Sequence, residues 1–299
     1  MKDKIYEKYG YKVDYLTYKN DSISFNLGNF RYMLLKTNFS NEKLSIIDMI
    51  VKKLDSYAIF FHQLISSEDG YILKFGEHSY VLIRLRITSD RKITMNEILK
   101  LSSISINCSL ENQLVEKIDF LENYFSNYQK LELANIDYFI GLTENAITLF
   151  NIIGKENKNF IGHKRLHYDE RAVDFYNPLN IVLDYRTRDL AEYAKSAFIN
   201  GNNCIIEILE LLHPADYFSF FARLMFPSFY FDSIDQYIKH GTKLDKKRIS
   251  SLANSLEKNL RQVYNLIYPN LPYIEWLSNV DNFWNFGYFF FNCRFNALL

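Results

Sequence analysis

The sequence predicts an α+β fold in two parts, a strand-rich part over residues 1–87 and a mainly helical part over residues 88–299. In the first part, short segments alternate apolar and polar residues, which is typical of half-buried strands. In the second part, apolar residues recur every three or four positions, which favours amphipathic helices. A polar segment over 88–98 separates the two patterns, and we expect the hinge between the parts near 87–95.

The first part is expected to form a sheet with one helix. Residues 22–27 alternate cleanly, and a Gly-Asn turn leads into the next strand, which ends on Lys36. Asn41 is a suitable N-cap for a helix whose apolar face recurs at helical spacing up to Leu54. Further strands are expected at 11–18, 61–66, 71–75 and 80–87.

The second part is expected to consist of helices around two short apolar runs, at 160–163 and 181–184. Residues 110–125 carry one apolar face, and 136–153 form a longer apolar helix. Further helices are expected at 205–212, 215–225, 229–238, 249–267 and 271–277.

Composition argues against several classes of function. The chain carries 35 basic and 35 acidic side chains, so its charge gives no electrostatic case for a nucleic acid or an anionic membrane as partner. No apolar run approaches the ~18 residues of a membrane span. The start lacks the apolar core of a signal peptide, which favours a cytoplasmic protein. No GxSxG motif of a serine hydrolase occurs.

Cysteine and histidine give no case for a transition-metal centre, and none is expected. The three cysteines are scattered and form no CxxC motif, so neither a disulfide framework nor a zinc site is predicted. His163 and His167 stand four positions apart, but a third ligand at a suitable spacing is not evident.

The stretch 160–196 carries the pattern that points to chemistry. An apolar run closes on Asp184, and an Asp-Leu-Ala sequence beginning at Asp189 opens a helix-compatible segment. This order resembles the kinase-like fold of the aminoglycoside phosphotransferases, and the resemblance implies a bilobal protein-kinase-like architecture. It also implies that Asp184 holds Mg²⁺ on the phosphates of ATP. For Asp189 it implies a structural role, capping or bracing a buried helix start.

The catalytic loop departs from that family. Such enzymes carry His-Gly-Asp-Leu, whereas the matching residues here, from His163 onward, read His-Lys-Arg-Leu. Arg165 stands in place of the catalytic Asp, and a guanidinium cannot accept the proton of a substrate hydroxyl. Losing a positioned base typically costs ~10²- to 10⁴-fold in rate. Arg165 could instead pair with Asp184 and close the site.

Two features of this loop leave alternatives open. The family carries an Asn soon after its catalytic Asp, but Asn177 and Asn180 lie late, next to Asp184. The side chains that could replace the missing base are Asp169, Glu170 and Asp174, and the spacing does not choose among them. Asp174 is also a weaker metal candidate.

Lys36 is the candidate for binding the nucleotide phosphates. A strand that ends in Lys and precedes a helix resembles the kinase arrangement in which a strand lysine reaches the α- and β-phosphates. Its partner carboxylate should then lie on the following helix, where Asp48 and Glu42 are available. A glycine-rich phosphate loop is missing, because residues 11–26 contain no glycine.

Four segments sharpen the resemblance. They are similar, in the same order, to motifs of the spore-coat-associated, kinase-like proteins of endospore-forming Bacillota, and they cover 138–147, 184–193, 222–231 and 272–277. The catalytic loop of that family is also degenerate. The resemblance implies a role in a spore coat, with protein partners in that assembly.

The sequence therefore supports two functional hypotheses. The first is a pseudokinase, a kinase-like protein with a degenerate catalytic loop that works by binding or assembly. The second is an active ATP-dependent small-molecule phosphotransferase that uses Lys36 and Asp184 on nucleotide and Mg²⁺. The aromatic residues over 218–231 could serve as an interface, but their helical spacing favours core packing.

Overall fold

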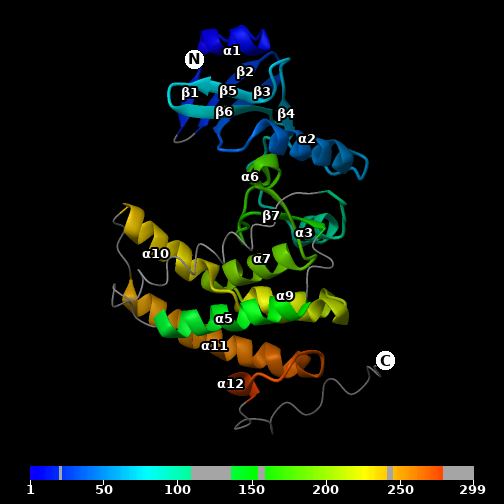
Figure 1. Cartoon of the computed structure of the whole chain (residues 1–299), viewed down its shortest axis with the longest axis vertical. Coiled ribbons are helices and arrows are strands. Elements are labelled where there is room, and N and C mark those ends of the chain that lie inside the picture. The colour runs from blue at the N-terminus through cyan, green and yellow to red at the C-terminus, as the bar shows by residue number, and fades with distance from the viewer. Residues whose placement is uncertain (20–21, 109–135, 154–158, 241–244, 279–299) are drawn as a thin grey trace.

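A computed structural model describes residues 1–19, 22–108, 136–153, 159–240 and 245–278. Within these ranges an antiparallel sheet lies at one end of the molecule and a stack of helices at the other (Figure 1). The α+β architecture expected from the sequence is confirmed. The predicted helix over 110–125 lies outside the described residues.

The sheet runs in the order β1-β2-β3-β6-β4, and β5 also pairs with β6. All of these pairings are antiparallel. Leu34 lies opposite both Ile23 and Leu82, so one face buries an apolar row across three strands, as the alternating sequence predicts. The strands are β1 (Thr17–Lys19), β2 (Ser22–Leu27), β3 (Phe30–Lys36), β4 (Gln63–Ile65), β5 (Ile72–Phe75) and β6 (His78–Arg84).

Helix α1 (Lys2–Tyr9) covers that face and was not predicted from the sequence. Ile5 is its one buried residue and joins the cluster on the sheet, while Gly10 ends the helix in the left-handed conformation at φ 71°. A polar helix with a single apolar anchor has no periodic signature, which is why the pattern of residues did not reveal it.

Helix α2 (Asn41–Asp55) follows β3 and buries the apolar face that the sequence predicts. Its N-cap is Ser40, whose hydroxyl accepts a hydrogen bond from the Lys43 amide at 3.3 Å. The prediction that Asn41 caps this helix was therefore wrong. The Asn41 side chain instead accepts a hydrogen bond from the Tyr71 amide at 3.0 Å, joining α2 to the start of β5.

The helical part begins with α3 (Met95–Ser102), where Thr94 and Glu97 form a capping box. Helix α5 (Ile136–Ile153) has the predicted bounds and packs on α9, which Figure 1 shows as neighbours. Phe139 of α5 stacks on Tyr230 with ring centroids 3.8 Å apart. The remaining helices are α7 (Arg188–Ile199), α8 (Ile205–Leu211), α9 (Tyr217–Met225), α10 (Ser228–His240), α11 (Lys246–Ile267) and α12 (Glu275–Ser278).

The aromatic residues over 218–231 are core. Five of their rings are fully or almost fully buried, and the other two are half-buried against the same cluster. The buried rings are those of Phe220, Phe221, Phe226, Tyr230 and Phe231. Among the described residues, no helix combines the length and apolar content that a membrane span requires.

A small hairpin lies beneath the sheet. Strands β7 (Phe160–His163) and β8 (Ile181–Asp184) pair antiparallel, and the residues between them carry the short helix α6 (Ala172–Phe175). This connecting segment rises toward the sheet, as the place of α6 in Figure 1 shows. It is held there by backbone hydrogen bonds from His62 N to Tyr176 O at 2.9 Å and from Ala172 N to Arg91 O at 2.8 Å.

Candidate functional site

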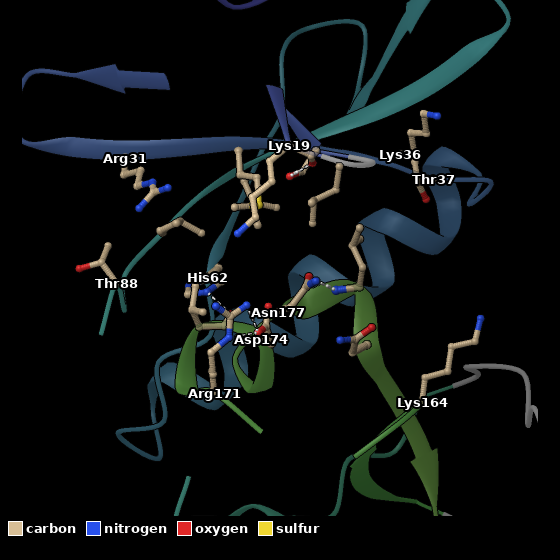
Figure 2. Close-up of a pocket in the computed structure, with 18 of the residues that line it drawn as sticks. Lys19, Arg31, Lys36, Thr37, His62, Thr88, Lys164, Arg171, Asp174 and Asn177 are labelled. Atoms are coloured by element: carbon tan, nitrogen blue, oxygen red, sulfur yellow. Dashed lines mark hydrogen bonds and ion pairs between the residues drawn. The ribbon is translucent and has the colours of Figure 1, made fainter. Parts of the chain in front are cut away.

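A cavity of about 760 Å³ lies between the sheet and the β7–β8 connection. We call it the cleft. Its roof is the face of the sheet opposite α1, and Met33, Leu35 and Ile83 line the cavity from this face. Its floor is formed by the connection, where Figure 2 shows Asp174 and Asn177. Val173 and Leu179 of the same segment also line the cavity. The volume is within the range of about 300–1,000 Å³ typical of small-molecule sites.

His62 ties the two walls of the cleft together. Its Nε2 bonds the Val173 carbonyl oxygen at 2.8 Å, and its Nδ1 accepts a hydrogen bond from the Arg86 amide at 3.2 Å. Both bonds fit the neutral imidazole with hydrogen on Nε2. Burial lowers the pKa of His62, which favours the same neutral form.

Lys36 ends β3 and lines the cleft, whereas Asp48 does not. Asp48 lies within α2, and its buried carboxylate pairs with Lys52 of the same helix at 2.6 Å and accepts a hydrogen bond from the Tyr71 hydroxyl at 3.0 Å. The contact with Tyr71, the residue before β5, gives Asp48 a role in joining α2 to the start of β5.

Asp184 ends β8 with its side chain only 2% exposed, and it does not line the cleft. Its Oδ2 forms an ion pair with Nη1 of Arg188, four positions later. Its Oδ1 accepts a hydrogen bond from the Tyr185 amide at 2.8 Å. A second guanidinium, that of Arg223, comes within 4.0 Å of the same Oδ2. Both carboxylate oxygens are therefore engaged by the protein itself.

The Arg188 guanidinium contacts three acceptors. Besides its bond to Asp184, its Nε donates to the His163 carbonyl oxygen at 2.7 Å, and its Nη2 donates to the Lys164 carbonyl oxygen at 3.2 Å. The guanidinium thus joins the loop after β7 to the end of β8. The guanidinium paired with Asp184 is that of Arg188, and not that of Arg165, which lies exposed on the loop.

The donor set around Asp184 does not fit Mg²⁺. That ion requires oxygen ligands in octahedral geometry and usually keeps several waters. Here a buried guanidinium occupies the carboxylate, and the only other charge within 4.0 Å of Asp184 among the described residues is the cation Arg223. Nor does any group of three His, Cys, Asp or Glu gather as a metal site in the described part of the chain.

His163 and Asp189 brace the loop. One oxygen of Asp189 accepts a hydrogen bond from the His163 amide at 2.8 Å, and the other lies 2.6 Å from His163 Nδ1. The second ring nitrogen of His163 lies 2.8 Å from the Phe175 carbonyl oxygen. All three side chains are buried. Asp189, at the start of α7, therefore holds the backbone and the ring of His163 together.

The cleft carries basic side chains that sequence reasoning did not single out. Lys19, Arg31 and Arg171 line it together with Lys36 and Lys164 (Figure 2). The balanced charge of the whole chain gives no sign that these basic side chains meet at one place. Arg188 was also missed, although its position four residues after Asp184 is the spacing at which a helix pairs opposite charges.

Two solved structures share the fold. An aminoglycoside phosphotransferase from Alicyclobacillus acidocaldarius superposes with a TM-score of 0.52 at 12% identity, covering 88% of this chain and 92% of that one. A spectinomycin phosphotransferase in complex with ADP and spectinomycin superposes with a TM-score of 0.54 at 11% identity, covering 90% and 97%. At this identity the likeness shows the fold alone, which is the kinase-like fold expected from the sequence.

The family is shown by sequence. Residues 109–267, just over half of the chain, match the family model described as "Spore coat putative kinase YutH". The endospore coat-associated protein YutH of Bacillus subtilis is 25% identical over 149 residues, which cover 41% of this chain and 44% of that protein. The match thus spans less than half the length of this relative. By its family match and its fold, the chain belongs to the YutH family of spore-coat, kinase-like proteins.

Proposed function

We propose that this protein is a pseudokinase of the spore coat, which works by binding or assembly and not by metal-dependent phosphoryl transfer. The observation that carries the proposal is the buried ion pair between Asp184 and Arg188. In kinases, phosphoryl transfer depends on metal ions that bridge the phosphates and neutralise their charge. A carboxylate already bound to a guanidinium is a poor anchor for such an ion.

The free energy of the buried ion pair between Asp184 and Arg188 opposes Mg²⁺ binding at Asp184. To bind Mg²⁺, Asp184 would have to release Arg188 and leave a buried guanidinium without its anion, at a cost on the order of 3–5 kcal/mol. The same movement would break the bonds from Arg188 to the carbonyl oxygens of His163 and Lys164. Arg165, at the position of the catalytic base, cannot take the substrate proton.

The spore-coat role rests on the family. The Bacillus subtilis relative is named for its association with the endospore coat. In this proposal the protein is made in the cytoplasm and assembles with protein partners in the coat. Such a role does not require the catalytic Asp, which Arg165 replaces in this chain. The cleft would then serve recognition.

The second candidate is an ATP-dependent small-molecule phosphotransferase. It is favoured by the volume of the cleft and by Lys36, which lines it. The carboxylate of Asp174, which also lines the cleft and pairs with Arg171 at 2.7 Å, is the base that this candidate would use. It also requires that Arg188 release Asp184.

Thermal unfolding with ATP separates the two candidates. A ligand at about 100 times its dissociation constant stabilises a fold by ~2.7 kcal/mol, which a melting curve resolves. We expect that adding Mg²⁺ to ATP gives no further rise in Tm over ATP alone, and that no phosphate is released. A rise that requires Mg²⁺, disappears in Asp184→Asn and accompanies phosphate release would establish the phosphotransferase instead.

A further inference from the structure

We infer that Arg223 is a second partner of Asp184, which binds the carboxylate when Arg188 releases it. One guanidinium or the other then neutralises Asp184, and the carboxylate is open to a metal in neither arrangement. The inference rests on the proposed function in one respect, namely that Asp184 of the wild-type chain does not hold Mg²⁺. It adds the residue that keeps Asp184 closed and the movement that this residue permits.

The end of the Arg223 side chain is buried without hydrogen bonds. Arg223 belongs to α9, its side chain is 2% exposed, and its Nε donates to Oε1 of Glu192 at 2.6 Å. Neither Nη1 nor Nη2 forms a hydrogen bond with a described residue, although both atoms are buried. A buried donor without an acceptor is costly, above all in a charged group, so this arrangement calls for an explanation.

The unbonded end of Arg223 lies next to Asp184. Its Nη1 is 4.0 Å from Oδ2 of Asp184, which is the oxygen that Nη1 of Arg188 already binds. A charge-assisted N–H···O bond is typically about 2.7–2.9 Å long, so Nη1 has to move by only about 1 Å to form one. Helix α7, which carries Arg188 and Glu192, lies beside α9 (Figure 1), and the two guanidiniums therefore approach the same carboxylate from neighbouring helices.

Glu192 does not depend on Arg223 alone. The same Oε1 accepts a hydrogen bond from Lys195 Nζ at 2.9 Å, and Oε2 accepts one from the Ser228 hydroxyl at 3.2 Å. Glu192 therefore keeps two partners if the Arg223 guanidinium tilts toward Asp184. A guanidinium carries five N–H donors, so Arg223 can also keep Nε on Glu192 while Nη1 binds Oδ2 of Asp184.

Arg188 holds Asp184 in the structure because its guanidinium has two further acceptors, the carbonyl oxygens of His163 and Lys164. The two guanidiniums repel each other, since burial lowers the pKa of Arg188 and the positive charge of Arg223 lowers it further. They compete for one carboxylate oxygen. When Arg188 leaves Asp184, that oxygen becomes free and the repulsion falls, so Arg223 is drawn to it.

The exchange bears on the loop after β7. Arg188 ties this loop to Asp184 through the carbonyl oxygens of His163 and Lys164. If the loop moves away, Arg188 must leave either these oxygens or the carboxylate. With Arg223 able to replace it, Arg188 can follow the loop while Asp184 keeps a cation, which avoids the cost of a buried unpaired charge. The loop can thus rearrange without opening a metal site.

Two substitutions separate the partners of Asp184. Arg188→Gln keeps an N–H donor for the His163 carbonyl oxygen at the place of Nε and removes the Nη1 that binds Asp184. Arg223→Lys keeps a cation that can reach Glu192 from the place of Nε and removes both Nη groups. Each variant thus retains one contact of the native side chain and loses the atoms that the inference concerns.

Thermal unfolding of the full chain is measured in both backgrounds. In the wild type the Nη groups of Arg223 form no hydrogen bond with described residues, so Arg223→Lys should change Tm little. In Arg188→Gln, Nη1 of Arg223 should donate to Asp184, so the same substitution should lower Tm by about 4 °C more than in the wild type. Arg261→Lys, in the partly exposed pair with Glu257, should have the same effect in both backgrounds.

A crystal structure of Arg188→Gln examines the exchange directly. We expect Nη1 of Arg223 to lie within about 3.2 Å of Asp184 Oδ2. The corresponding distance in the wild type is 4.0 Å. If Arg188→Gln does not fold, Arg188→Lys takes its place in both experiments, because it keeps the positive charge and still lacks Nη1.

The outcomes separate this inference from the proposed function. Equal effects of Arg223→Lys in the two backgrounds, or an Arg223 that stays at its wild-type distance in the crystal, would overturn the inference and leave the proposed function standing. So would Mn²⁺ that binds to Arg188→Gln and is lost when Asp184→Asn is added, because the carboxylate would then be open once Arg188 is gone. Mn²⁺ bound through Asp184 by the wild type would contradict both.

Discussion

Replacing Arg188 by methionine removes the guanidinium from Asp184 and keeps much of the side-chain volume. The variant leaves a buried carboxylate whose closest remaining cation, within the described ranges, is Arg223 at 4.0 Å. It also removes the donors to the carbonyl oxygens of His163 and Lys164. Breaking a buried ion pair from one side typically costs about 3–5 kcal/mol. That is a large fraction of the 5–15 kcal/mol by which folded domains are typically stable.

A double-mutant cycle isolates the pair. Asp184→Asn alone leaves Arg188 buried without its anion, so it should also be strongly destabilising. The combined variant removes both charges, and its loss should be smaller than the sum of the single losses by on the order of 1–3 kcal/mol. The free energy of unfolding, measured in urea by circular dichroism, gives each value.

A matched control is the pair of Arg261 and Glu257, which has the same spacing of four residues and a distance of 2.7 Å. Both side chains are about one-third exposed, so Arg261→Met should cost about 1 kcal/mol or less. A loss for Arg188→Met as small as that of the control, or additive losses in the cycle, would refute the view that Arg188 is fixed on Asp184.

Three further predictions concern the frame around the site. Burial lowers the pKa of His62 below its ordinary 6.5, so below about pH 6.5 the unfolded chain binds more protons than the folded one. Tm should therefore fall as the pH drops below about 6.5, and His62→Gln should make Tm depend less on pH. An unchanged pH dependence of Tm in this variant would contradict the role of His62. Thr94→Ala removes a capping box and should cost about 1 kcal/mol in urea unfolding, whereas no loss would be unexpected. Gly162→Ala should cost about 1–3 kcal/mol, because the added Cβ would lie 3.1 Å from both Arg188 Cδ and Asp189 Oδ1; unchanged stability would show that these atoms can move.

The fold was predictable where the spacing of apolar residues along the sequence shows which side chains are buried. Helix α5 has the bounds that its apolar spacing gives, and the strands of the sheet follow the alternating segments. Boundaries were less accurate: the expected strand at 11–18 is reduced to Thr17–Lys19, because Val13 packs in the cluster with α1 without pairing in the sheet. Tertiary contacts, and not local pattern, set such limits.

The candidate site was predictable only in part. Sequence order was enough to bring His163, Asp184 and Asp189 to attention, and the structure gathers all three around the β7–β8 hairpin. It offered Arg165 as a partner of Asp184 and missed Arg188, whose pairing depends on the turn between β8 and α7. The basic cleft depends on residues as distant as Lys19, Arg31 and Arg171, which only the folded chain brings together.

The most direct test of whether Asp184 still holds a metal is the binding of Mn²⁺, a paramagnetic substitute for Mg²⁺, followed by electron paramagnetic resonance with ADP present. With Asp184 paired to Arg188, we expect no Mn²⁺ signal that depends on this carboxylate, so wild type and Asp184→Asn should give the same bound fraction. Stoichiometric Mn²⁺ binding by wild type that Asp184→Asn abolishes would show that Arg188 yields the carboxylate, and would contradict the pseudokinase.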